Sequence, residues 1–98
     1  MASDKRFLAK LELIREMHER KMADYGTGTD PYANVRASQE FGVAPWLGAI
    51  IRLNDKVTRI KAFVRNAVLK NEPMRDNFSD IAVYAIIAWI LWDEEHGD

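Results

Sequence analysis

The stretch that decides the fold is DNFSDIAVYAIIAWILW, residues 76–92. It opens with two aspartates, Asp76 and Asp80, and then continues without a charged residue to Trp92. Residues four apart lie on one face of an α-helix, so the two carboxylates are predicted to lie together beside a segment that must be buried. Such charges need a metal, another cation or a basic side chain from a neighbouring helix to neutralise them.

The size and composition of the chain limit what it can be. With 98 residues, of which 48% are hydrophobic, it has enough material for one core, and we expect a single domain over residues 1–98 whose tail, residues 94–98, frays. The apolar run over residues 81–92 is well short of the roughly 20 residues of a membrane span, so no membrane contact is expected.

Charge and cysteine content exclude several classes of function. The formal net charge is -1, which gives no basic field for direct nucleic-acid binding. Cysteine is absent, so disulfides, thiol catalysis and cysteine-based zinc sites are excluded, and a cytoplasmic location is the natural expectation.

The last helix should cover residues 75–94, and three further helices are predicted before it. Pro45 suits the first turn of a central helix, and Asn71-Glu72-Pro73 should break it. This helix carries two stripes, and the second one would make Asp55 project into a packing surface. A first helix is expected over residues 4–23, capped by Ser3 or Asp4, followed by a loop over residues 26–31 and a short helix over residues 33–40 that Gly42 ends.

These elements predict an all-α protein, a small four-helix bundle with a short second helix. The last helix has almost no polar face, which is more apolar surface than one short chain readily covers. We therefore expect a homo-oligomer, a dimer or a tetramer, with an interface that includes this helix.

Three aspartates are candidate metal ligands: Asp76 and Asp80 on the last helix, and Asp55 from the central one. Hard cations such as Mg²⁺, with Mn²⁺ as an alternative, take carboxylate oxygens together with substrate phosphates and water. In the structural alternative, Asp76 is favoured by the helix dipole and Asp80 pairs with an arginine such as Arg52 or Arg59. Tyr84, close to the same face, is a further candidate for substrate binding.

Basic and acidic side chains around these aspartates have two interpretations each. Lys56, Arg59 and Lys21 could bind phosphate, or they could extend to solvent and neutralise the aspartates. Glu12, Glu16 and Glu19 form an acidic stripe on the first helix. Arg15 and Arg20 nearby favour a solvated face, although one glutamate could complete a metal shell.

Three motifs occur in order: K-x-x-D-Y-G from Lys21, R-L-x-D-K-x-x-R from Arg52, and D-x-x-x-D-h-A-x-Y-A from Asp76, where h is a hydrophobic residue. Together, over residues 21–89, they resemble a phage-type nucleotide-modification-associated domain, which is similar to the MazG-like all-α nucleoside triphosphate pyrophosphohydrolases.

The resemblance implies a helical, oligomeric, Mg²⁺-dependent enzyme that hydrolyses a (deoxy)nucleoside triphosphate to the monophosphate and pyrophosphate. It further implies roles for the residues in the motifs. Asp55, Asp76 and Asp80 would hold the metal, which activates a water molecule for attack on a phosphoryl group. The remaining positions would bind substrate. Lys21, Lys56 and Arg59 would lie at the phosphates, and Asp24 and Tyr25 would line the nucleotide pocket.

The acidic pattern differs from that of MazG-like enzymes, which carry an E-x-x-E pair on one helix and E-x-x-D on another. Here the central helix offers Asp55 and the last helix offers D-x-x-x-D. Two alternatives therefore stay open: a module that binds nucleotide without cleaving it, and a protein-interaction module of phage origin whose aspartates only pair with basic residues.

Overall fold

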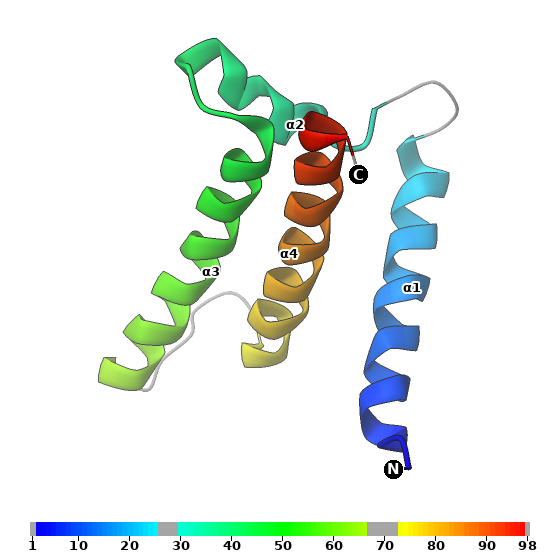
Figure 1. Ribbon diagram of the computed structural model, residues 1–98. Helices are drawn as coiled ribbons and strands as arrows, with labels where there is room; N and C mark the ends of the chain where they lie inside the picture. The colour runs from blue at the N-terminus through cyan, green and yellow to red at the C-terminus, as the bar shows by residue number, and fades with distance from the viewer. Residues whose placement is uncertain (1, 26–29, 67–72, 98) are drawn as a thin grey trace. The chain divides into compact units, whose positions relative to one another are not determined.

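The computed structural model describes residues 2–25, 30–66 and 73–97, and for residues 23–25 only the backbone. This part of the chain is helical: α1 (Lys5–Tyr25), α2 (Ala33–Arg36), the 3-10 helix η1 (Ala37–Phe41), α3 (Pro45–Asn66) and α4 (Met74–His96) (Figure 1). The predicted all-α class is confirmed, with four α-helices in the described ranges, while the bundle and its oligomeric state stay predictions. None of the described helices is long and apolar enough to cross a membrane.

The chain forms two compact units, Met1–Pro31 and Tyr32–Asp98. The first unit contains α1, which begins as predicted because Asp4 caps it: the carboxylate accepts a hydrogen bond from the backbone N–H of Arg6 at 2.8 Å. The helix continues to Tyr25, two residues beyond the predicted boundary. Most of the loop predicted over residues 26–31 lies outside the described residues.

In the second unit, α3 and α4 lie side by side and run antiparallel (Figure 1). Trp46, at the start of α3, contacts Trp92, near the end of α4, edge to face with ring centroids 5.0 Å apart. Between them lies a small core of Val35, Ala49, Ala88 and Leu91. Small alanines on both helices allow the backbones to approach closely, which explains how a short chain fixes this pair.

The segment formed by α2 and η1 packs on the first turns of α3, and Gly48 is where they meet. A β-carbon on Gly48 would lie 2.8 Å from the carbonyl oxygen of Val35 and 2.7 Å from Oγ of Ser38. The Ser38 hydroxyl donates a hydrogen bond to the carbonyl oxygen of Val43 at 2.9 Å, which holds the turn into α3. Gly42 ends η1 as predicted, with a φ of 75° that favours glycine.

Two details of α3 and α4 differ from the sequence predictions. Within the unit Tyr32–Asp98, the expected second packing surface of α3 is not formed: Ile51, Asp55 and Thr58 are exposed. The physical reason is that α2 and η1 cover only the first turns of α3. Helix α4 runs two residues further than expected, to His96, and Gly97 with a φ of 79° closes it. The predicted break after α3 falls largely outside the described residues.

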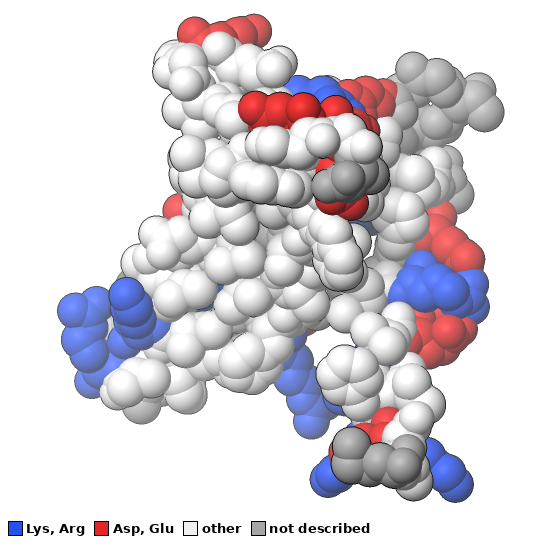
Figure 2. All heavy atoms as spheres, in the orientation of Figure 1, with Lys and Arg blue, Asp and Glu red and all other residues white. Residues whose placement is uncertain are grey.

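Charge is unevenly distributed over the second unit. Figure 2 shows Lys and Arg over the last turns of α3 and Asp and Glu near η1 and the end of α4, with a broad area of uncharged surface between them. Within that unit, several exposed side chains are large and apolar, notably Phe41, Val64, Phe78 and Trp89. The fold of this unit therefore leaves several large apolar side chains exposed on its surface.

Candidate functional site

An ion pair joins the central parts of α3 and α4. Nζ of Lys56 lies 3.0 Å from Oδ2 of Asp80, and the two side chains are only 16% and 27% exposed. The antiparallel packing thus brings the motif that begins at Arg52 against the motif that begins at Asp76. Lys56 was one of the basic residues predicted to neutralise the aspartates, beside Arg52 and Arg59, and the structure shows that it is Lys56 that pairs with Asp80.

Asp76 lies in the first turn of α4, one helical turn before Asp80, and is exposed. Its carboxylate is favoured there by the unpaired backbone N–H groups and the positive end of the helix dipole. Because residues four apart share a face, Asp76 and Asp80 are on one flank of α4, as the sequence predicted. The exposed carboxylate of Asp76 is therefore accessible to a ligand, whereas the carboxylate of Asp80 is held in place by Lys56.

Asp55 is exposed on α3, next to Lys56 in sequence. Successive residues of a helix point about 100° apart, so Asp55 is turned further from α4 than Lys56 is. In the ranges that the structure describes, no three Asp, Glu, His or Cys side chains form a group that could hold a metal ion. The structure therefore joins Asp80 to Lys56 but does not gather the three aspartates.

Asn77 is a polar residue of this region that the sequence analysis did not single out. It is fully buried on α4, between Asp76 and Asp80, and its Oδ1 has no hydrogen-bond partner among the described residues. Its Nδ2 lies 4.0 Å from the sulfur of Met74. A buried acceptor that has no donor costs about 1–3 kcal/mol. The sequence held one indication of its location: residues three apart lie on a similar side of a helix, and Asn77 precedes Asp80 by three residues.

The other predicted substrate-binding residues lie in different places. Arg59 is exposed on α3 one turn after Lys56, and Tyr84 is half-buried on α4 one turn after Asp80. Lys21 is exposed on α1, in the other unit. The predicted roles of Asp24 and Tyr25 concern side chains that lie outside the described residues.

On α1, Arg15 holds two of the three candidate glutamates. Its guanidinium forms ion pairs with Glu12 and Glu19, and its Nε lies 3.0 Å from both carboxylate oxygens of Glu12. These hydrogen bonds lower the pKa of Glu12 and raise that of Arg15. Glu16 is exposed. The arrangement favours the solvated face over a metal shell for Glu12 and Glu19.

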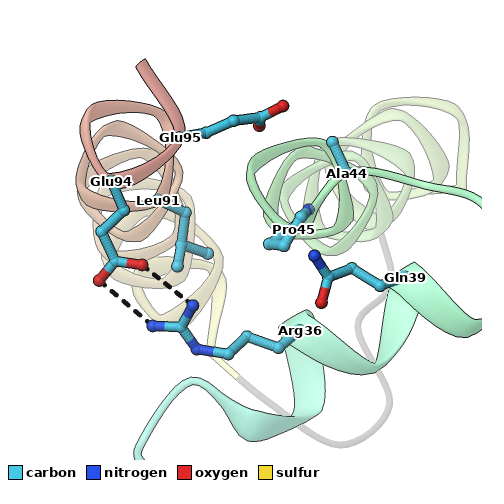
Figure 3. Close-up of a pocket in the computed structure, with 7 residues that line it drawn as sticks. All are labelled: Arg36, Gln39, Ala44, Pro45, Leu91, Glu94 and Glu95. Carbon is cyan, nitrogen blue, oxygen red and sulfur yellow. Dashed lines mark hydrogen bonds and ion pairs between the residues drawn. The ribbon is translucent and has the colours of Figure 1, made fainter. Parts of the chain in front are cut away.

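A hollow of about 330 Å³ lies at the other end of the α3–α4 pair (Figure 3). Arg36 from α2 spans its base and binds Glu94 of α4 through both terminal nitrogens, at 3.0 and 3.2 Å. Leu91 and Pro45 form apolar walls, while Gln39 and Glu95 lie at the rim.

This hollow is separate from the Lys56–Asp80 pair. Glu94 is fourteen residues beyond Asp80 on one helix, a distance of about 21 Å at 1.5 Å per residue, which is longer than a triphosphate chain. The charge of Arg36 is matched by Glu94, so the hollow offers no excess positive charge for phosphate.

No protein-family model matches the chain, and neither a curated protein nor a solved structure shows significant similarity to it.

Proposed function

We propose that the protein hydrolyses a (deoxy)nucleoside triphosphate to the monophosphate and pyrophosphate in a Mg²⁺-dependent reaction. The observation that carries this proposal is the contact between Lys56 and Asp80. It places a fixed cation and a fixed carboxylate side by side on adjacent helices, with the exposed Asp76 one turn away. Phosphate transfer to water needs a cation for the phosphate oxygens and carboxylates for the metal, and both chemical types are present there.

Each side chain has a role in the proposal. Asp76 and Asp80 would hold Mg²⁺. Asp55, the third ligand that the resemblance implies, would reach the metal only after a change from the arrangement described above. Lys56 and Arg59 would neutralise the phosphates, and Tyr84 would contact the substrate. As the resemblance implies, Lys21 would be a further cation for the phosphates, and Asp24 and Tyr25 would line the nucleotide pocket. When bound, the metal would activate the attacking water and offset phosphate charge.

The donor set fits Mg²⁺ in its common protein mode, in which one or two carboxylates are supplemented by water and substrate phosphates. Asp76 is exposed and so has free coordination positions, and Asp80 shares its face of α4. Mn²⁺, which also prefers oxygen ligands, would serve as a substitute. The proposal further includes a homo-oligomer, a dimer or a tetramer built on α4.

A second candidate function is nucleotide binding without hydrolysis. It is favoured by one observation: Asp80 is already neutralised by Lys56, and no three-residue acidic group is formed in the described parts of the chain. A site of this kind could bind a nucleotide through Lys56 and Arg59 while lacking the ligands for turnover. The same ion pair also fits the third alternative, a protein-interaction module.

The test is pyrophosphate release from a panel of dNTPs and NTPs with Mg²⁺ or Mn²⁺. We compare the wild type with Asp76→Asn, which alters an exposed residue and should leave the fold intact, and with Asp80→Asn. Glu95→Gln, an exposed carboxylate further along the same helix, is the matched control. We expect release by the wild type and by the control, and a loss of about 100-fold or more in both aspartate variants.

Two outcomes would contradict the hydrolase proposal. One is the absence of product from every nucleotide with metal present, by a protein whose circular dichroism shows it folded. Equilibrium dialysis with the same nucleotides then separates binding without turnover from no binding at all. The other is release that survives Asp76→Asn and Asp80→Asn unchanged, which would indicate a different site or a contaminating enzyme.

A further inference from the structure

Within the unit Tyr32–Asp98, the outer face of α4 is apolar and largely uncovered, although Trp92, at its edge, also contacts Trp46 of α3. Phe78, Trp89 and Trp92 are 58%, 69% and 42% exposed. Their spacing continues through Ala82 and Ala85 in steps of four, three, four and three residues, which is the spacing of a helix–helix seam. We name the residues Phe78, Ala82, Ala85, Trp89 and Trp92 the α4 seam.

The order of side-chain sizes along the α4 seam specifies a direction of pairing. The large residues lie toward its two ends and the alanines lie in the middle. In a parallel pair of α4 helices, Trp89 would face Trp89 and Ala82 would face Ala82, which leaves a clash in one layer and a void in the other. In an antiparallel pair with a two-fold axis beside Ala85, Trp89 faces Ala82 of the second copy and fills the space that it leaves. At each end of the seam, Phe78 lies nearly level with Trp92 of the second copy, which gives an aromatic pair.

The charges at the ends of α4 favour the same direction. Arg75 lies near the start of the seam and Asp93 near its end, on the same side of the helix. Neither forms an ion pair within the part of the chain that the structure describes. In the antiparallel pair, Arg75 ends about 4.5 Å along the axis from Asp93 of the second copy, less than one helical turn. In a parallel pair, each would face its own like charge.

The area is sufficient for a modest interface. An aromatic side chain offers about 150–250 Å², so the three seam aromatics expose roughly 300–400 Å² together. With the neighbouring Ile86 and Ile90, two copies would bury on the order of 1,000 Å², close to the lower limit of specific interfaces. An interface at this limit is typical of weak, reversible association, although area alone does not set the dissociation constant.

We propose that the α4 seam binds a second copy of the chain in an antiparallel, two-fold symmetric pair, with Ala85 at the axis and Trp89 packed over Ala82 of the other copy. The pairing rests on the homo-oligomer of the proposed function and specifies its geometry. It can hold or fail separately from the nucleotide reaction, because the centre of the seam and Asp80 point to opposite sides of α4, roughly 160° apart at 100° per residue.

The first test is sedimentation equilibrium across a concentration series of the full chain. We expect a dimer for the wild type, and a dissociation constant raised at least tenfold by Trp89→Glu, because a central aromatic is replaced by a charge. Phe41→Glu, at an exposed phenylalanine of η1, is the matched control and should leave the dimer unchanged. A wild type that stays monomeric at high micromolar concentration would overturn the proposal, as would a dimer that tolerates Trp89→Glu.

The second test determines the direction of pairing and uses the absence of native cysteine. In the antiparallel pair, the two copies of residue 85 lie within about 1.5 Å of the same level, whereas the two copies of residue 82 lie about 10 Å apart, beyond the reach of a disulfide. We therefore expect rapid oxidative cross-linking of Ala85→Cys and little of Ala82→Cys. Ala37→Cys, exposed on η1, is the control. Cross-linking of both seam variants indicates a parallel pair, and cross-linking of neither indicates another interface; either result contradicts the proposal.

Discussion

At the scale of single residues, the clearest electrostatic effect is at the start of α1. Asp4 accepts hydrogen bonds from the side chain of Arg6, at 3.1 and 2.8 Å, and from its backbone N–H. These bonds lower the pKa of Asp4 below its ordinary value of 3.8. The bonded form is the carboxylate, so the folded helix binds a proton less readily than the unfolded chain. The stabilisation is therefore complete above pH 3.8 and is lost as the pH falls through the lowered pKa.

We expect an NMR titration of the Asp4 carboxyl carbon to give a midpoint below 3.8, with the Arg6 amide shift following the same curve. In Asp4→Asn, the pH-dependent change of the Arg6 amide should disappear, while the rest of α1 keeps its shifts. A midpoint at or above 3.8 would contradict the cap, because it would show that the charged form gains nothing on folding.

Gly48 makes a second prediction at this scale. Gly→Ala inside a helix normally stabilises by about 1 kcal/mol. Here the added β-carbon would meet the carbonyl oxygen of Val35 at 2.8 Å, an atom of the backbone that cannot rotate away. We therefore expect Gly48→Ala to lower the free energy of unfolding by about 1–3 kcal/mol, measured by urea denaturation.

The contact with Ser38 provides a control for this prediction. Ser38→Gly removes the two other atoms that a β-carbon at position 48 would approach. Combined with Gly48→Ala, it should recover part of the loss that Gly48→Ala causes, although not all of it. A Gly48→Ala protein as stable as the wild type would mean that α2 and α3 are further apart than described.

At the scale of the elements, the Lys56–Asp80 pair couples α3 to α4. Because both side chains are mostly buried, we expect a coupling of about 1 kcal/mol in a double-mutant cycle built from Lys56→Met and Asp80→Asn. The double variant should be more stable than the sum of the two single effects predicts, because each single variant leaves one polar group without its partner. Urea denaturation of the four proteins measures it, and additive effects would show that the pair contributes nothing to helix packing.

The helices themselves were largely predictable, because capping and helix-ending residues act locally. Asp4, Pro45 and Gly42 each mark the boundary that the sequence predicted, and the period of α3 and α4 was plain. The pairing between the helices was less predictable. The sequence predicted that Asp80 pairs with a basic residue of the central helix and offered Arg52, Lys56 and Arg59, because helical spacing alone does not determine which of several neighbouring cations reaches across.

At the scale of the whole molecule, prediction from sequence was weaker. The expected all-α class is confirmed, but Asp55, which was expected to project into a second packing surface, is exposed within its unit, because α2 and η1 cover only the first turns of α3. The predicted convergence of Asp55 with Asp76 and Asp80 depends on distances between helices, which sequence periodicity does not contain. Asn77 was missed for a related reason: its position three residues before Asp80 places it near that side of α4, but the sequence does not show how deeply that side is buried.

The edge-to-face contact between Trp46 and Trp92 also gives the protein an intrinsic optical reporter. Two indoles with centroids 5.0 Å apart and planes inclined at 76° are close enough for their electronic transitions to couple. Such coupling gives a paired positive and negative circular dichroism band that neither chromophore produces alone. Because one indole belongs to α3 and the other to α4, the band reports the docking of these two helices without any label. It therefore offers a way to follow their separation in real time.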